Sequence, residues 1–525
     1  MNRFKIKLKN GGYKMILNVE KPYIWLPVSK NAPERKLHFY IEGKKIQEID
    51  IHLGKTDCEF YGCWDASAFL GKDLQIEGAD KELLEGIFCY GKPYDNVYPY
   101  RPKLHAAPAT GWHNDPNGMV YADGFYHLYY QWNPYGSMWG NMQWGHVKSK
   151  DLYHWEQEGL AIAPDETGTV YSGCGIQDKD NLTGYGEGAL LYFYTAAGGR
   201  NQWSVDAGNL FTQRLAYSTD GGKTLQRSEK FCMPHIVNEN RDPKVFYHKE
   251  SKAFIMVLYL DGYDFAVYRS TDLLNWEETQ RISEPGMWEC PDLLELEVKN
   301  VPGEKRWVFW SADGYYMTGE FDGYKFKPDG CRKSGYSSVL PYAAQTFSGV
   351  DDRVISMAWL RMKNDRGNYR GLMSLPTELS LEKEGNDYKI CFAPAKELEN
   401  LETGWYDNLR NTISPEGQAC KIVLTPEAGT KGEWRLTIGR LRLTADFYSN
   451  ILSIEDTETH VYYMRERIST EQEISFIFDQ EVIEVFAENG KVYGAAETGE
   501  NILGMDWEVF RTEDLKVSEK MCLYK

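Results

Sequence analysis

The chain has 525 residues, with 59 Lys or Arg, 77 Asp or Glu and a net charge of −18 at pH 7. This length exceeds what one hydrophobic core usually supports, so we expect about two to four domains. The acidic balance and the lack of a basic stripe argue against a nucleic-acid partner. No run reaches the roughly 18 apolar residues of a membrane helix, so we expect no membrane partner either.

The N-terminal stretch and the cysteines bear on the cellular compartment. The N-terminus has basic residues but lacks an apolar run of signal-peptide length followed by a small-residue cleavage site. The ten cysteines are scattered without a CxxC pair or a regular framework. We therefore expect a reducing, cytoplasmic setting.

Short apolar or alternating runs bounded by Gly, Asp, Asn or Pro dominate the chain and predict β-strands. Convincing helical periodicity is nearly absent. Asp-Gly pairs such as Asp123-Gly124 supply the positive φ that tight hairpins need. Aromatic residues make up 14% of the chain, which fits either pleated strands or sugar binding. The expected strands, in chain order, include 4–10, 36–43, 124–132, 189–197, 252–260, 306–312, 353–360, 433–441 and 474–479.

Differences in amino-acid composition divide the sequence into three segments. Residues 1–95 form a β-rich unit, residues 100–385 have the highest density of Trp, Tyr and Gly, and residues 390–525 are more charged. The middle segment contains loosely similar units of strand, turn, strand, then Ser/Thr-Asp and Trp, at a period that suggests propeller blades. Many short strands at regular spacing favour propellers and sandwiches.

Three acidic motifs stand out in the middle segment: WHNDPNG at 112–118, RDP at 241–243 and WECPD at 288–292. Their order along the chain corresponds to one motif per expected blade. A propeller brings the inner strand of every blade to a common axis, so these carboxylates can converge on one pocket. Carboxylates that meet there repel one another, which is typical of a functional site. One protonated carboxyl and one carboxylate are what the cleavage of a glycosidic bond requires.

These motifs resemble glycoside hydrolase family 32, the invertase, inulinase and levanase family. The resemblance covers about residues 100–500 and includes YRPKLHAAPATGWHNDPNGMVYADGFYHLYYQWNP, WGNMQWGHVKSKDLYHWE, YSGCG, RDPKVFYH, WECPDLLEL, YAAQTF, ISMAWL, MSLPTELSL and FIFDQEVIEVFAENG in the family's order. It implies an all-β chain with a five-bladed β-propeller at 100–385 and a β-sandwich at 390–525. Residues 1–95 lie outside the shared core and resemble a β-rich accessory domain of some bacterial members; sugar binding, dimerisation or lining of the pocket mouth stays open as its role.

By position, the resemblance implies three catalytic carboxyl groups. Asp115 would attack the anomeric carbon and form a fructosyl-enzyme, while Glu289 would protonate the leaving oxygen and then deprotonate the incoming water. Asp242 would hold fructose hydroxyls and stabilise the transition state. Arg241 would orient this cluster and offset its charge. The further positions that match the fructose subsite are Asn114, Gln131, Trp139, Ser172, Trp359 and Tyr342.

Each of these residues also has a purely structural interpretation. Asp115 within Asp-Pro-Asn-Gly could make an Asx-type turn, and the Trp residues could be core. The structural interpretation is disfavoured because all the motifs occur together. His113 stands where the family commonly has Met, and Leu340-Pro341-Tyr342 stands where Asp-Phe-Tyr is common. These departures affect the pocket that selects the substrate.

The leading hypothesis is a retaining exo-β-fructosidase that acts on sucrose, fructo-oligosaccharides or fructans. The alternatives are a fructosyltransferase that uses the same residues, a catalytically silent fructan-binding protein, and a related five-bladed glycosidase that cleaves arabinose polymers with inversion of configuration. We expect a small neutral sugar as partner, without a metal or cofactor, and we leave open whether the chain forms a homo-oligomer. A cytoplasmic setting favours short substrates over polymeric inulin or levan, and the lack of a Lys or Arg cluster that would mark a phosphate site favours unphosphorylated ones.

Overall fold

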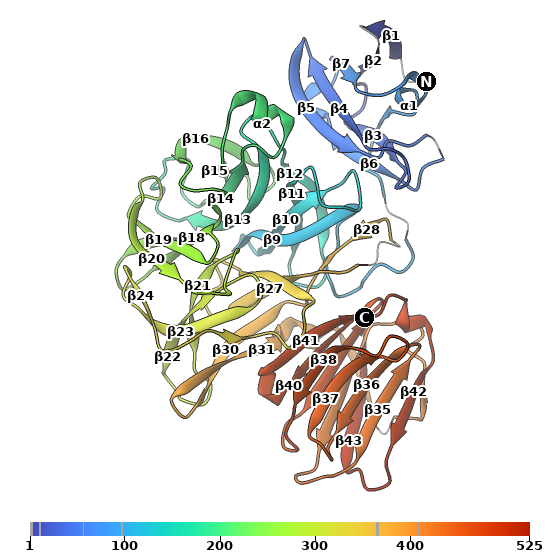
Figure 1. Ribbon diagram of the computed structural model, residues 1–525, viewed down its shortest axis with the longest axis vertical. Coiled ribbons are helices and arrows are strands. Elements are labelled where there is room, and N and C mark those ends of the chain that lie inside the picture. The colour runs from blue at the N-terminus through green and yellow to red at the C-terminus, as the bar shows by residue number, and fades with distance from the viewer. Residues whose placement is uncertain (1–3, 10–11, 56, 96–97, 364–366, 408) are drawn as a thin grey trace.

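The computed structural model describes residues 4–9, 12–55, 57–95, 98–363, 367–407 and 409–525. Figure 1 shows three successive β-rich parts, from the N-terminal domain in blue through the propeller to the C-terminal sandwich in red. The all-β class predicted from the strand signals is confirmed. No helix in the described part of the chain has the length and apolar character that a membrane crossing requires.

The N-terminal domain packs a five-stranded sheet of order β1-β2-β7-β4-β5 against a three-stranded sheet of order β6-β3-β8. Its strands alternate between buried and less buried residues, as in β6, so the apolar faces of the two sheets share a core of their own. The elements are β1 (Phe4–Lys9), β2 (Gly12–Asn18), β3 (Tyr23–Val28), β4 (Arg35–Ile41), β5 (Lys44–Ile51), β6 (Phe60–Asp65), η1 (Ser67–Phe69), β7 (Asp73–Glu77), α1 (Lys81–Leu84) and β8 (Phe88–Tyr90).

Five antiparallel sheets, each with at least four strands, form the blades of the propeller. Blades I to III are β9 (Gly111–Ala122), β10 (Phe125–Asn133), β11 (Gln143–Ser149) and β12 (Glu156–Ile162); β13 (Thr169–Asp178), β14 (Ala189–Ala197), β15 (Thr212–Ser218) and β16 (Gln226–Met233); and β17 (Arg241–His248), β18 (Ala253–Asp261), β19 (Asp264–Ser270) and β20 (Glu277–Ser283). Helix α2 (Gln202–Ala207) lies between β14 and β15.

Blades IV and V complete the ring. They consist of β21 (Asp292–Glu297), β22 (Lys305–Trp310), β23 (Tyr315–Phe321), β24 (Phe326–Pro328) and β25 (Lys333–Ser334); and of β26 (Pro341–Thr346), β27 (Val354–Leu360), β29 (Leu372–Met373), β30 (Thr377–Glu384) and β31 (Asp387–Pro394). Between β27 and β29 the chain returns to blade I, where β28 (Tyr369–Arg370) pairs in parallel with β9. This pairing ties the last blade to the first.

The first strand of each blade lies toward the propeller axis. Strand β9 contacts both β13 and β26, and β13 contacts β17. Glycines permit the close approach of β9 and β13, because a Cβ added at Gly175 would lie 2.6 Å from the carbonyl oxygen of Gly118. After the C-terminal end of β9, Asp123 and Gly124 both have positive φ, of 51° and 79°, and form the predicted hairpin turn to β10.

The C-terminal sandwich consists of two six-stranded sheets, β32-β43-β34-β39-β40-β41 and β33-β42-β35-β36-β37-β38. Trp434 and Trp507 are fully buried between them, and Trp434 stacks on Phe476 with ring centres 5.6 Å apart. The elements are η2 (Lys396–Leu401), β32 (Glu402–Asp407), β33 (Thr412–Ile413), β34 (Cys420–Pro426), β35 (Glu433–Ile438), β36 (Leu441–Asp446), β37 (Ile451–Asp456), β38 (Val461–Arg467), β39 (Ile474–Asp479), β40 (Val482–Ala487), η3 (Glu488–Gly490), β41 (Val492–Glu497), η4 (Ile502–Gly504), β42 (Trp507–Arg511) and β43 (Val517–Tyr524).

The boundary expected between 385 and 390 falls inside a hairpin and is wrong by one strand. Strands β30 and β31 pair from Thr377 opposite Pro394 to Glu384 opposite Asp387, so blade V extends to Pro394. The charged run around Gly385 resembles a linker, but it is the tight turn of this hairpin, where Gly385 has a φ of 64°. The first sandwich strand begins only at Glu402.

A buried cluster of charges, the His105 clamp, joins the start of the propeller to the sandwich. Nδ1 of His105 lies 2.8 Å from Asp479 Oδ2 and Nε2 lies 3.0 Å from Glu484 Oε1, and all three side chains are fully buried or nearly so. Asp479 also accepts hydrogen bonds from the backbone N–H groups of Lys103 and Leu104. Burial alone would lower the pKa of His105, but the hydrogen bonds to the two carboxylates outweigh it and raise this pKa to about 9.

The His105 clamp predicts a pH-dependent stability. A group whose pKa is raised on folding stabilises the fold fully below its unfolded pKa, about 6.5 for His, and loses this contribution as the pH rises through about 9. We therefore expect the urea midpoint of the parent chain to fall over this interval. His105→Gln should lower the stability at pH 6 by about 3 kcal/mol and should lack the alkaline fall, because it leaves buried carboxylates without a cationic partner.

His154→Gln is the matched control, since His154 pairs with Asp151 at 2.7 Å on the surface. We expect its urea midpoint and pH dependence to stay close to those of the parent. An undiminished alkaline fall in the His105→Gln chain would contradict the prediction.

Candidate active site

The three predicted carboxyl groups meet at the propeller axis. Asp115 lies in β9 of blade I, Asp242 is the second residue of β17 in blade III, and Glu289 lies three residues before the start of β21 of blade IV. All three line one pocket of about 320 Å³. The convergence expected from one acidic motif per blade is therefore present.

A β-bulge presents Asp115 to the pocket. Strands β9 and β10 are in register at His113 and again at Pro116, so Asn114 and Asp115 together stand opposite one residue, Gln131. Ser172 Oγ donates to Asp115 Oδ2 at 2.6 Å, and Asn114 Nδ2 donates to Oδ1 at 3.1 Å. Trp112 Nε1 in turn donates to Asn114 Oδ1 at 2.7 Å and so orients the amide.

Burial raises the pKa of Asp115, because removal from water disfavours the charged carboxylate. The hydrogen bonds from Ser172 and Asn114 oppose this effect, and the negative charge of Glu289 adds to it. The Asp115 carboxylate is thus held by two neutral donors and directed at the pocket, as a nucleophile requires.

Asp242 is buried in a strained conformation. Its φ is 63°, and its backbone N–H donates to Thr195 Oγ1 at 3.0 Å. Burial raises its pKa to about 7; Arg241 acts against this rise, and the charges of Glu289 and Asp115 contribute to it. Glu289 and Cys290 also have positive φ, of 52° and 40°, so left-handed backbone is concentrated at this site.

Glu289 is held between a cation and a phenol. Arg241 donates to Oε1 at 2.6 Å, and the Tyr342 hydroxyl donates to Oε2 at 2.7 Å. The Arg241 guanidinium also lies 4.6 Å from the ring centre of Tyr259 and 3.7 Å from Asp242 Oδ2. Arg241 therefore contacts two of the three carboxyl groups and offsets part of their charge.

Cys290 bridges the other two carboxyl groups. Its thiol lies 3.7 Å from Asp115 Oδ2 and 3.5 Å from Asp242 Oδ2, and its backbone N–H donates to Asp242 Oδ2 at 3.1 Å. Burial, reinforced by the surrounding carboxylates, raises the pKa of Cys290 well above its usual value. The thiol therefore stays protonated and acts as a donor between two carboxylates, without the reactivity of a thiolate.

All seven predicted binding residues line the same pocket. Trp139 is 51% exposed at the rim, and Trp359 stands edge-on to Tyr342 with ring centres 6.0 Å apart. Gln131 uses its amide to donate to the carbonyl of Val170 at 3.0 Å. The pocket-lining members of the predicted set are Asn114, Gln131, Trp139, Ser172, Arg241, Tyr342 and Trp359.

The pocket is also lined by three residues that the sequence motifs did not indicate: Tyr171, Arg200 and Glu239. Tyr171 is adjacent to Ser172 and stands edge-on to Trp139, with ring centres 6.0 Å apart. Arg200 and Glu239 form an ion pair between two separate loops. Adjacency to a motif could have identified Tyr171, but no local signal indicates that Arg200 and Glu239 are neighbours.

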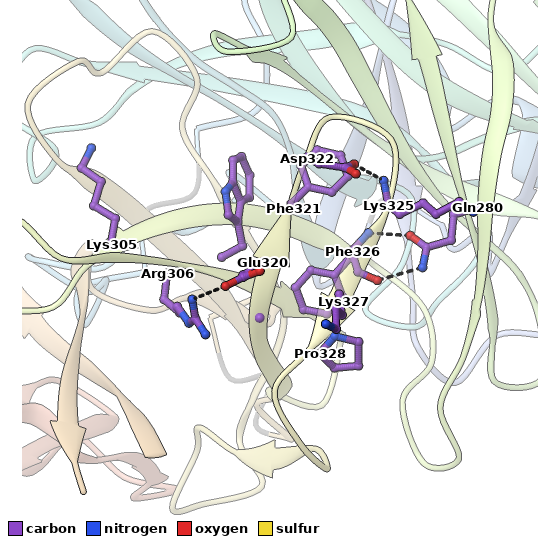
Figure 2. A pocket seen from close by; sticks show the side chains of 12 residues that line it. Gln280, Lys305, Arg306, Glu320, Phe321, Asp322, Lys325, Phe326, Lys327 and Pro328 are labelled. Carbon is purple, nitrogen blue, oxygen red and sulfur yellow. Dashed lines mark hydrogen bonds and ion pairs between the residues drawn. The ribbon is translucent and has the colours of Figure 1, made fainter. Parts of the chain in front are cut away.

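A larger cavity, of about 720 Å³, lies on the flank of blade IV (Figure 2). Its polar groups largely satisfy one another: Gln280 pairs with the backbone of Phe326, and Arg306 donates to Glu320 at 3.1 Å. None of the three carboxyl groups at the axis lines it. The pocket at the axis therefore has the groups for acid–base and nucleophilic chemistry, although it is smaller.

Comparisons with known proteins identify what the chain is similar to. Residues 105–394 match the family described as "Glycosyl hydrolases family 32 N-terminal domain". The chain is 35% identical to a levanase of Bacillus subtilis over 403 residues, which cover 70% of this chain and 57% of the levanase. It is 33% identical to an invertase of Debaryomyces hansenii over 290 residues, 49% of this chain and 52% of the invertase. The matched part thus spans little more than half of either relative.

The fold is similar to that of a solved structure. The crystal structure of exo-inulinase from Aspergillus awamori aligns with a TM-score of 0.73 and 22% identity, covering 82% of this chain and 99% of the inulinase chain. At this identity the likeness concerns the fold. It supports the arrangement of a five-bladed propeller followed by a sandwich.

The contacts of Asp115 predict the effect of Ser172→Ala. The Ser172 hydroxyl donates to the ionised carboxylate, so its removal disfavours ionisation and should raise the pKa of Asp115 above that in the parent. A ¹³C NMR titration with carboxyl-labelled aspartate measures this pKa. Ser348→Ala is the control, because the Ser348 hydroxyl donates to the carbonyl of Gly175. An equal or lower Asp115 pKa in the Ser172→Ala chain would refute the assigned hydrogen bond.

Proposed function

This chain belongs to glycoside hydrolase family 32, and from that membership we propose that it is a retaining exo-β-fructosidase. It releases terminal β-fructofuranosyl units from sucrose, fructo-oligosaccharides or fructans through a fructosyl-enzyme. Asp115 is the nucleophile, Glu289 is the acid/base and Asp242 stabilises the transition state. The activity named for the levanase and the invertase supports the proposal.

One observation carries the proposal: carboxyl groups from three blades line one pocket and have different partners. Asp115 is approached by neutral donors, whereas Glu289 lies between Arg241 and Tyr342. A glycosidase needs one carboxylate that attacks and one carboxyl that exchanges a proton with the leaving oxygen. The surroundings distinguish the two groups, and the positions of the WHNDPNG and WECPD motifs assign the nucleophile to Asp115 and the acid/base to Glu289.

The reaction follows in two displacements. Asp115 attacks the anomeric carbon of the terminal fructose, the bond from that carbon to the bridging oxygen breaks, and Glu289 gives its proton to that oxygen. Water then enters, and Glu289 removes a proton from it as its oxygen attacks the same carbon. The bond to Asp115 breaks, and fructose leaves with the configuration retained. Glu289 is protonated again at the end of the cycle.

Asp242 and the aromatic side chains supply binding rather than proton transfer. Buried at the base of the cluster and fixed by the backbone of Cys290, Asp242 can accept hydrogen bonds from sugar hydroxyls, which strengthen as positive charge develops on the ring. Trp139 and Trp359 offer apolar surfaces to the sugar. A small, neutral substrate fits this pocket of about 320 Å³. The cytoplasmic location and the preference for short unphosphorylated sugars stay predictions.

The assigned roles predict that Asp115→Asn and Glu289→Gln inactivate the protein. Glu289→Gln removes the proton donor and should lower kcat on sucrose by about 10²–10⁴-fold. Asp115→Asn removes the nucleophile and should lower it at least as far. Initial rates of fructose release measure both effects.

Glu320→Gln is the control for these rates, because Glu320 lies in the blade IV cavity of Figure 2. Its kcat should equal that of the parent. An Asp115→Asn variant that released fructose as fast as the parent would overturn the mechanism, and a chain that bound fructan without releasing fructose would be the silent binding protein.

Retention and hydrolysis predict the identity and configuration of the products. NMR of fresh reaction mixtures should detect β-fructofuranose before its anomers equilibrate, because two displacements at one carbon restore the configuration. At high sucrose concentration, glucose and fructose should appear in equal amounts if water accepts the fructosyl group. An excess of glucose with new oligosaccharides would identify a fructosyltransferase, and an inverted first anomer would refute the fructosyl-enzyme.

A further inference from the structure

Strand β5 of the N-terminal domain forms hydrogen bonds with two segments at the rim of the active-site pocket. Asp50 contacts the loop between β10 and β11, which carries Trp139, and Glu48 contacts α2, which begins two residues after Arg200. Trp139 and Arg200 both line the pocket. In Figure 1 the blue domain lies beside α2 and blade I. One strand outside the propeller thus contacts both rim segments.

In the first loop, Asn141 both accepts a hydrogen bond from β5 and donates one to it. Asn141 Oδ1 accepts from the backbone N–H of Asp50 at 2.8 Å, and its Nδ2 donates to the carbonyl of Asp50 at 2.7 Å. This amide satisfies two main-chain groups of β5, as a neighbouring strand would. The same loop inserts Tyr135, which is 1% exposed, into the core of the N-terminal domain. The backbone of the loop is therefore fixed on both sides of Trp139.

The grip on the second loop uses a buried carboxylate. Glu48 is 6% exposed, and its Oε1 accepts from the backbone N–H of Gln202 at 2.8 Å and of Trp203 at 3.3 Å. These are first-turn N–H groups of α2, which have no partner within the helix. Lys45 donates to Glu48 Oε2 at 3.1 Å and lies over the ring of Trp203. Glu48 thereby holds the start of α2, and with it the adjoining Arg200.

We propose that the N-terminal domain is a positioning element for the mouth of the pocket, and that Glu48 and Asn141 are its positioning residues. They hold the Arg200–Glu239 pair and Trp139 where the part of a short oligosaccharide beyond its terminal fructose contacts the protein. This inference rests on the proposed function. If the rim is already ordered in the free protein, binding of the substrate does not lose free energy to the ordering of these loops. The gripped loops therefore set affinity for the leaving part of the sugar and not the rate of bond cleavage.

Four variants of the full-length chain test the proposal. Glu48→Ala leaves the α2 N–H groups without their acceptor, and Asn141→Gly removes the amide but suits the positive φ of 44° at this position. Glu48→Gln keeps an acceptor oxygen and is the conservative rescue. Glu82→Gln is the control, because Glu82 pairs with the exposed Lys55 in the same domain.

The readouts are the kinetics on 1-kestose and inhibition by free fructose. For Glu48→Ala and Asn141→Gly we expect KM to rise about five- to tenfold with kcat within about twofold of the parent, as expected when a buried hydrogen bond is lost. Glu48→Gln should recover most of the parent KM, and Glu82→Gln should match the parent. The fructose inhibition constant of Glu48→Ala should stay at the parent value, because the carboxyl groups at the axis are untouched.

Hydrogen–deuterium exchange of the same proteins separates this proposal from the proposed function. Segment 198–207 should exchange faster in Glu48→Ala, while β17 and the N-terminal core strand β4 keep the protection of the parent. Unchanged exchange at 198–207, or faster exchange with an unchanged KM, would overturn the proposal. If the parent chain released no fructose from any substrate, the proposed function would fail, and the exchange data would still decide whether Glu48 holds α2.

Discussion

The repulsion among three carboxyl groups in one pocket is the constraint on which the rest of the structure depends. Asp115, Asp242 and Glu289 come from blades I, III and IV, and burial raises the pKa of the first two. Arg241 offsets part of this charge by contacting Glu289 and Asp242. Neutral hydrogen-bond donors, among them the Ser172 hydroxyl and the Cys290 thiol, stabilise the remaining negative charge. Such a cluster persists only where the surrounding fold holds each group in place.

The propeller meets that requirement by closing on itself. Residues that are far apart in the sequence face one axis because the first strands of neighbouring blades pack together, with Gly118 and Gly175 allowing β9 and β13 to approach. Parallel pairing of β28 with β9 ties blade V to blade I. The His105 clamp then fixes the entry to β9, the strand that carries Asp115, against the sandwich. The segment that leads into Asp115 is thus fixed by two contacts at the N-terminal end of β9.

The sequence predicted the centre of the site better than its edge. The carboxyl groups and their neighbours lie in short motifs whose residues stay together in the fold, so Asn114 beside Asp115 and Arg241 beside Asp242 could be identified from the order of residues. The boundary near 385 was wrong because a hairpin turn and a linker share the same charged, glycine-containing composition. Arg200 and Glu239 were missed because their pairing depends on how two loops of different blades meet.

The same distinction explains why the role of the N-terminal segment stayed open at the level of sequence. Glu48 occurs in KKIQEIDI, where an acidic residue among lysines predicts an exposed strand face, yet it is buried against a helix more than 150 positions later in the chain. The carboxyl groups at the axis lie in short sequence motifs, whereas the segments at the mouth of the pocket are held by contacts with another domain. Substrate choice can therefore diverge through a strand such as β5 while the carboxyl groups remain unchanged, because the two sets of residues are held by different parts of the molecule.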